Sequence, residues 1–123
     1  MEKVTGIGGF FFRARDTDAL AAWYRENLGV DAGHDQIWQQ HAGMTVFAPF
    51  KEESDYFAAD KRWMLNLRVA DMKAMIAQLR AKGVEVETRP DWESTEYGNF
   101  ARIHDPEGNP IELWEPPAGS TAV

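Results

Sequence analysis

Cysteine is absent from the 123 residues, which excludes disulfide bridges, thiolate nucleophiles and cysteine-ligated zinc. No apolar run approaches the roughly 20 residues that a membrane span needs. Positive charge is also scarce, because 13 Lys and Arg stand against 20 Asp and Glu and leave a formal net charge of −7. An acidic chain repels phosphates and anionic lipid, so we expect neither nucleic acid nor a membrane as partner. The first residues lack a secretory pattern, and we expect a cytoplasmic protein.

The composition is that of an ordinary globular domain, with 44% hydrophobic, 12% aromatic and 27% charged residues. We expect a single domain over 1–117 and a flexible tail over 118–123. Residues 51–62 are charged and rich in turn formers, which predicts a linker. This linker separates a first module, at about 6–50, from a second module at about 63–117.

The pattern of apolar residues predicts strands and one helix in each module. Asp16 and Asp71 are suitable N-caps, and Gly29 and Gly83 follow the two helical patterns at the usual C-terminal position. The turn 105–109 predicts a tight antiparallel hairpin, since proline presets the first turn angle and glycine takes the left-handed conformation. The predicted strands cover residues 7–15, 36–40, 44–48, 63–69, 84–88, 100–104 and 111–115.

A weak internal repeat relates the two modules. A shift of 55 positions superposes Arg13 on Arg68, Asp16 on Asp71, Ala19 on Ala74, Ala22 on Ala77 and Arg25 on Arg80. Each module then runs strand, helix and two or three further strands. The fold class predicted is α+β, with two such modules forming one curved sheet and the helices on its outer face.

Alternation along the predicted strands divides the side chains between two faces of the sheet. The wholly apolar set must pack against the helices. The other set mixes aromatic and polar groups, which is the composition of a ligand cleft. It consists of Phe11, Arg13, Met64, Asn66, Arg68, Glu112 and Trp114.

Three segments of the sequence resemble the vicinal oxygen chelate superfamily, which contains glyoxalase I, bleomycin-resistance proteins and extradiol dioxygenases. They are FFRARD, LAAWYRENLGV and ARIHDPEGNPIELWEPP, and the resemblance extends from Ile7 to Pro117. It implies two βαβββ modules around a cupped mixed sheet, and a homodimer.

Metalloenzymes of this superfamily hold a divalent ion at about four positions, usually His, Glu or Gln. The resemblance places these positions at Gly9, Thr45, Met64 and Glu112. Only Glu112 offers a suitable donor, because glycine has no side chain and a thioether is a poor partner for hard or borderline ions. We therefore disfavour a divalent metal and predict no cofactor.

Several charged candidates have two interpretations. Glu112 is a base or a ligand contact, or else a cleft carboxylate paired with Arg13 or Arg68. The two arginines either hold a ligand anion together or serve structural roles at strand ends. His104 is a weak metal or acid–base candidate, and a solvent-facing histidine at a strand end is the commoner case.

Aromatic residues are numerous, and some of them must belong to the core. We expect Trp38 and Trp114 to form walls of the cleft, because flat rings suit planar ligands. The full set of expected ligand-binding residues is Phe11, Arg13, Trp38, Phe47, Met64, Asn66, Arg68, Tyr97 and Trp114.

Three functions remain open on the sequence. The first is a metal-free binding protein for a planar or acidic small molecule, in the manner of bleomycin-resistance proteins. The alternative is a divalent-metal-dependent lyase, isomerase or dioxygenase that uses Glu112 with a nonstandard ligand set. The third is a subunit without a ligand of its own, with the cleft filled by its own side chains.

Overall fold

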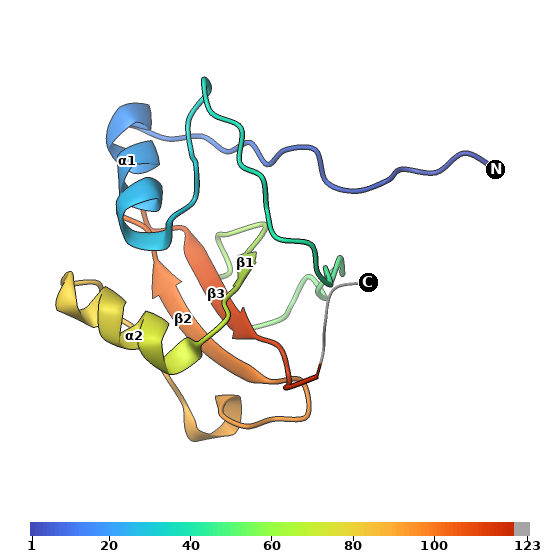
Figure 1. Cartoon of the computed structure of the whole chain (residues 1–123), viewed down its shortest axis with the longest axis vertical. Coiled ribbons are helices and arrows are strands. Elements are labelled where there is room, and N and C mark those ends of the chain that lie inside the picture. The colour runs from blue at the N-terminus through green and yellow to red at the C-terminus, as the bar shows by residue number, and fades with distance from the viewer. Residues whose placement is uncertain (120–123) are drawn as a thin grey trace.

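The computed structural model describes residues 1–119 of the chain. Two helices and three strands follow one another, with a short 3-10 turn, η1 (Pro90–Trp92), between the second helix and the second strand (Figure 1). The elements are α1 (Thr17–Leu28), β1 (Leu65–Arg68), α2 (Met72–Ala81), β2 (Asn99–His104) and β3 (Pro110–Glu115). Neither helix is long and apolar enough to cross a bilayer. The predicted tail at 118–123 falls largely on residues 120–123, which lie outside the described part.

The three strands form one mixed sheet in the order β1-β3-β2. β1 runs parallel to β3, and β2 pairs with β3 in the antiparallel direction. These strands confirm the predictions at 63–69, 100–104 and 111–115. The strand predicted at 84–88 is reduced to one isolated bridge between Glu87 and Arg102.

Both helices begin at the predicted aspartates. Asp16 accepts a hydrogen bond from the amide of Ala19, and Asp71 accepts one from the amide of Ala74, each at 3.0 Å. α1 ends at Gly29, which has a φ of 67° and is therefore in the left-handed region that glycine adopts without strain. The two capping bonds are equivalent under the 55-residue shift.

The last turns of the helices extend the repeat. Arg25 of α1 donates to the carbonyl of Ala32 at 2.8 Å, and Arg80 of α2 donates to the carbonyl of Val86 at 3.1 Å. Each arginine thus holds the chain that leaves its own helix. The internal repeat is visible in the helices, their caps and these exit contacts.

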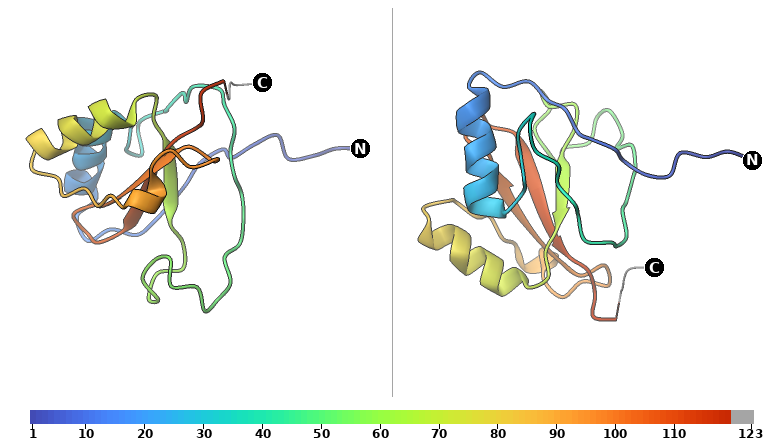
Figure 2. Two further views of the ribbon diagram at one scale, coloured as in Figure 1. Left: turned by 90° about the horizontal axis from the view of Figure 1, so that it is seen from below. Right: turned by 45° about the horizontal axis from the view of Figure 1, so that its top comes forward.

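The hydrophobic core lies between the helices and one face of the sheet (Figure 2). Side chains of both helices contact alternate residues of β2 and β3, as the alternation of the sequence predicts. The buried members of this core are Leu20, Tyr24, Met72, Leu79, Ala101, Ile103, Ile111 and Leu113. Burial of a side chain of this size stabilises the fold by about 1.5–3 kcal/mol.

The first module differs from the prediction. No strand forms at residues 7–15, 36–40 and 44–48. The chain there is irregular and extended (Figure 1). A strand requires a hydrogen-bonded neighbour, and in the single chain these segments have none. Most of their large apolar side chains are consequently exposed, although Phe12 and Ala14 pack against the core. The two-module βαβββ arrangement is not confirmed.

The turn between β2 and β3 is bonded to α1. The buried Asp105 carboxylate accepts from the Tyr24 hydroxyl at 2.7 Å and from the amides of Glu107 and Asn109 at 2.9 and 3.0 Å. Burial, followed by the bond to Asp105, raises the pKa of Tyr24, so its hydroxyl remains a donor. This bond fastens α1 to the hairpin.

Replacing the Tyr24 hydroxyl tests that attachment. Tyr24→Phe removes one of the two hydrogen bonds to Oδ2 of the buried Asp105 carboxylate, and we expect a loss of about 1–2 kcal/mol in the free energy of unfolding. Urea denaturation measures it. Tyr97→Phe, which removes an exposed hydroxyl, is the matched control and should change stability by less than about 0.5 kcal/mol. Equal stability of the two variants would contradict the attachment.

The Glu107 carboxylate makes a second attachment, between the β2–β3 turn and the start of α1. It accepts from the backbone amides of Arg15 and Asp16 at 2.7 and 3.0 Å, and these bonds lower its pKa below the ordinary value of 4.5. A lowered pKa gives stability that is present above the unfolded value and is lost as the pH falls through the folded one. We expect Glu107→Gln to flatten the decline in urea midpoint between about pH 6 and pH 3. Parallel pH profiles for the two proteins would show that these bonds contribute nothing.

Candidate functional site

The face of the sheet turned away from the helices carries polar and aromatic side chains. The strand register places Arg102 opposite Glu112 and Phe100 opposite Trp114. On the other side of β3, Asn66 lies beside Glu112 and Arg68 beside Trp114. The structure therefore brings Asn66, Arg68, Glu112 and Trp114 to one face, as predicted.

Glu112 lies at the centre of this face and is only 9% exposed. One carboxylate oxygen, Oε1, accepts a hydrogen bond from the Asn66 amide at 2.7 Å, and the other accepts from the Tyr56 hydroxyl. Among the described residues, no salt bridge involves Glu112. Of the two interpretations of Glu112, the one that pairs it with Arg13 or Arg68 is not found, because two neutral donors occupy the carboxylate instead.

Arg102 is the second buried charged residue on this face of the sheet, with 7% of its surface exposed. Its Nη2 donates to the carbonyl of Tyr56 at 3.0 Å, and its guanidinium lies 5.0 Å from the centre of the Tyr56 ring and 5.8 Å from that of Trp92. Its Nε is buried with no hydrogen-bond partner. A buried donor without an acceptor is costly, and it marks a place where a ligand oxygen would be stabilising.

Tyr56 joins the two charges, and sequence reasoning missed it. Burial, followed by the bond to Glu112, raises the pKa of Tyr56 to about 12, so the phenol is protonated near neutral pH and donates to the carboxylate. The residue lies in the segment 51–62 that was interpreted only as a linker. The available signal was three aromatic residues, Phe50, Tyr56 and Phe57, within a charged stretch; in the structure their rings contact one another.

Trp114 forms a wall of the site. It is buried, and its ring stacks on Phe100 at 6.4 Å with an interplanar angle of 8°. Its indole nitrogen donates to the backbone carbonyl of Tyr97 at 2.7 Å. The Tyr97 ring itself is 66% exposed, so this residue supports the wall through its backbone.

Arg68 contacts the chain rather than an open cleft. Its Nη2 donates to the carbonyl of His41 at 3.1 Å, and a Cβ at Gly43 would overlap its guanidinium. Arg13 is exposed, and no hydrogen bond or salt bridge is formed by its side chain in the described part. The structure does not bring the two arginines together as the anion-holding pair that was considered.

In the described part, four further expected lining residues take no part in the hydrogen bonds and aromatic contacts of Glu112, Arg102 and Tyr56. Phe11 is 89% exposed and Phe47 88% exposed, and Trp38 also faces solvent, because their segments have no strand partner. Met64 is half-buried at the start of β1. Within the described residues, no hydrogen bond or aromatic contact joins these four to Glu112, Arg102 or Tyr56.

The donor set does not fit a divalent metal. No three His, Asp or Glu side chains gather within the described residues, and both oxygens of Glu112 already accept hydrogen bonds. His104 shares a face of β2 with Arg102, but it pairs with Pro110 at the exposed end of the strand. Of the four positions that the resemblance marks, Glu112 alone carries a metal donor of the kind these enzymes use.

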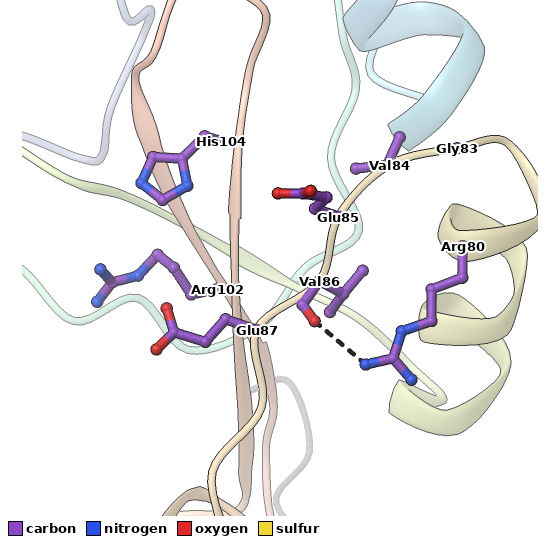
Figure 3. Close-up of a pocket in the computed structure, with 8 residues that line it drawn as sticks. All are labelled: Arg80, Gly83, Val84, Glu85, Val86, Glu87, Arg102 and His104. Carbon is purple, nitrogen blue, oxygen red and sulfur yellow. Dashed lines mark hydrogen bonds between the residues drawn. The ribbon is translucent and has the colours of Figure 1, made fainter.

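A hollow of about 610 Å³ lies along the outer edge of the sheet (Figure 3). Arg102 and His104 line it from β2, and residues 83–87 line it from the segment that follows α2. Neither Glu112 nor Tyr56 lines this hollow. It thus adjoins the Glu112 site and shares Arg102 with it.

Comparison with known proteins identifies relatives of this arrangement. A model of the glyoxalase-like domain matches residues 9–114. A similar solved structure is that of TnmS3, an antibiotic binding protein from Streptomyces sp. CB03234, with 24% identity and a TM-score of 0.63. The match covers 95% of this chain and 100% of that one. A search of curated proteins finds no significant match.

The attachment of residues 50–62 to the sheet gives a prediction. Tyr56→Ala removes the ring and the hydroxyl bond to Glu112, so we expect trypsin to cut after Lys51 and Lys61 about fivefold faster than in the wild type. Tyr97→Ala removes a ring of the same size from an exposed position and should leave the rate unchanged. Equal cleavage of Tyr56→Ala and wild type would refute the anchoring role of Tyr56.

Proposed function

The chain belongs to the glyoxalase-like domain family of the vicinal oxygen chelate superfamily, and from that premise we propose that it binds a planar small molecule on the Glu112 face of its sheet. The observation that carries this proposal is the buried Nε of Arg102, which has no acceptor although aromatic rings surround the guanidinium. A bound oxygen would supply the missing acceptor. The rings of Trp92 and Trp114 would supply flat apolar surface.

The ligand's polar chemistry follows from the two buried charges. Arg102 favours an acceptor such as a carbonyl, carboxylate or phenolic oxygen, and Glu112 favours a donor. A planar ring bearing oxygen substituents satisfies both requirements. The description of TnmS3 as an antibiotic binding protein is in keeping with this proposal, although at 24% identity the likeness to it concerns the fold alone.

Binding without the family's full metal site is part of the proposal. The residues Gly9, Thr45 and Met64 support it, because none of these three expected positions carries the usual His, Glu or Gln donor. The alternative, a metal-dependent lyase, isomerase or dioxygenase, would need a ligand set of another composition. Metal bound to Glu112 in the purified protein would favour that alternative.

We also propose that the protein is a homodimer. Large apolar side chains are exposed throughout the first 50 residues, and monomeric soluble proteins rarely leave so many uncovered. They are Met1, Val4, Ile7, Phe10, Phe11, Ile37, Trp38, Met44, Val46, Phe47 and Phe50. A second copy carries the same unpaired segments and the same free edge of β1, which are suited to pair with one another.

Ligand binding is tested with 2-naphthoate, a planar ring with an acceptor group, followed by tryptophan fluorescence. We expect saturable quenching, and about tenfold weaker binding to Arg102→Lys, since lysine keeps the charge but lacks the Nε donor and the planar face. Arg62→Lys, at an exposed position outside the cluster, is the control. An equal affinity in all three proteins would place the binding site elsewhere.

Metal content decides between the proposal and its alternative. In untagged protein purified without chelator, we expect well below one equivalent of zinc, nickel, iron or manganese by mass spectrometry. A near-stoichiometric ion that disappears in Glu112→Ala would overturn the metal-free proposal.

The dimer is tested by sedimentation velocity across a dilution series. We expect a dimer for the wild type, and a dissociation constant at least about tenfold higher for Phe47→Glu, because a charge at an apolar contact resists burial. Gln78→Glu adds the same charge on the exposed side of α2 and should sediment as the wild type does. A wild-type monomer at every concentration would contradict the proposal.

A further inference from the structure

We propose, on the basis of the function proposed above, that Tyr56 occupies the place of the ligand and that the site selects planar rings carrying a hydroxyl group. In the single chain the Tyr56 ring lies against the Arg102 guanidinium and its hydroxyl donates to Glu112. These are the contacts that a hydroxylated aromatic ligand would make. The contacts of Tyr56 with Arg102 and Glu112 therefore indicate which chemical groups a ligand at this site would carry.

The contacts of Tyr56 on the sheet are few and local. Within the described residues, only two hydrogen bonds join the segment 50–62 to the sheet, and both belong to Tyr56. The remaining hydrogen bonds of this segment are internal, and the aromatic contacts of Phe50 and Phe57 are with the segment itself. The ring of Tyr56 contacts Trp92 at 6.3 Å. Tyr56 can therefore leave the site without breaking the sheet, the helices or the core.

An incoming hydroxylated ring replaces the two contacts of the Tyr56 side chain, whereas the bond from Arg102 to the Tyr56 carbonyl is a backbone contact that it does not replace. Its hydroxyl donates to the Glu112 oxygen that Tyr56 gives up, and its face takes over the Arg102 guanidinium. A ring without a donor leaves that oxygen buried and unpartnered, which lowers affinity by about tenfold. Glu112 thus distinguishes hydroxylated rings from otherwise similar ones.

The ligand also gains a contact that Tyr56 does not make. The Nε of Arg102 remains without an acceptor while Tyr56 is in place, although the residue is buried. A second oxygen on the ligand would accept from it. Because of this additional hydrogen bond, a ligand with a second oxygen would bind more favourably at the site than the Tyr56 side chain does.

The test compares 2-naphthol with 2-methoxynaphthalene, which has the same ring but no donor, by calorimetric titration. We expect the wild type to prefer 2-naphthol about tenfold. Tyr56→Phe should bind 2-naphthol about fivefold more tightly than the wild type, since the competing hydroxyl is lost. Glu112→Gln should reduce the preference to less than about threefold. Tyr97→Phe, which removes an exposed hydroxyl, should behave as the wild type.

The outcomes separate this inference from the function on which it rests. If both probes bind the wild type equally and Tyr56→Phe changes nothing, planar binding stands and the role of Tyr56 is overturned. If neither probe binds any of the proteins, the proposed function fails as well. The wild type and Tyr56→Phe alone decide the matter should Glu112→Gln fail to fold.

Discussion

The buried carboxylate of Asp105 is the constraint on which the arrangement depends. It accepts hydrogen bonds from the Tyr24 hydroxyl and from the backbone and side chain of Asn109, at 2.7, 3.0 and 2.8 Å. By closing the turn it fixes the register of β2 on β3, and that register places Arg102 opposite Glu112. By accepting from Tyr24 it also holds α1 on the apolar side of the same hairpin. One side chain thus sets both the core and the site.

The two faces of the sheet carry out different tasks with the same strands. Ile111 and Leu113 of β3 point into the core, whereas Glu112 and Trp114 between and after them point to the other face. A shift of one residue in register would exchange these roles. The cost of burying Glu112 and Arg102 on the second face is offset by Tyr56 and Asn66, except at the Arg102 Nε. The unpaired Arg102 Nε is the donor through which we propose that this face binds a ligand oxygen.

The sequence predicted the elements whose signals are local. The helix caps at Asp16 and Asp71 and the turn 105–109 are each defined by a few neighbouring residues, and all three are found where expected. Segments 7–15, 36–40 and 44–48 have strand-like sequences, but a strand also needs a neighbour, and no local pattern supplies one. The strand-like pattern led us to expect Phe11 and Phe47 in the cleft. Because their segments form no strand, both side chains are exposed.

The candidate site divides in the same way. Alternation alone places Asn66, Glu112 and Trp114 on one face, because it depends only on position within a strand. Tyr56 reaches that face from an irregular segment, through contacts with residues 46 and 56 positions away in the sequence. No periodicity encodes such a contact. The sequence left open whether Glu112 pairs with an arginine, and it gave no sign that a tyrosine takes that place.

We propose that the Glu112 face binds a planar ligand without a change in the positions of the helices and strands. The most direct measurement follows the five tryptophan indole signals by NMR during titration with 2-naphthol. We expect the signals of Trp92 and Trp114 to move and saturate together, while that of Trp23, on α1, stays fixed. A shift confined to Trp23 and Trp38, or no shift at any of the five, would contradict it.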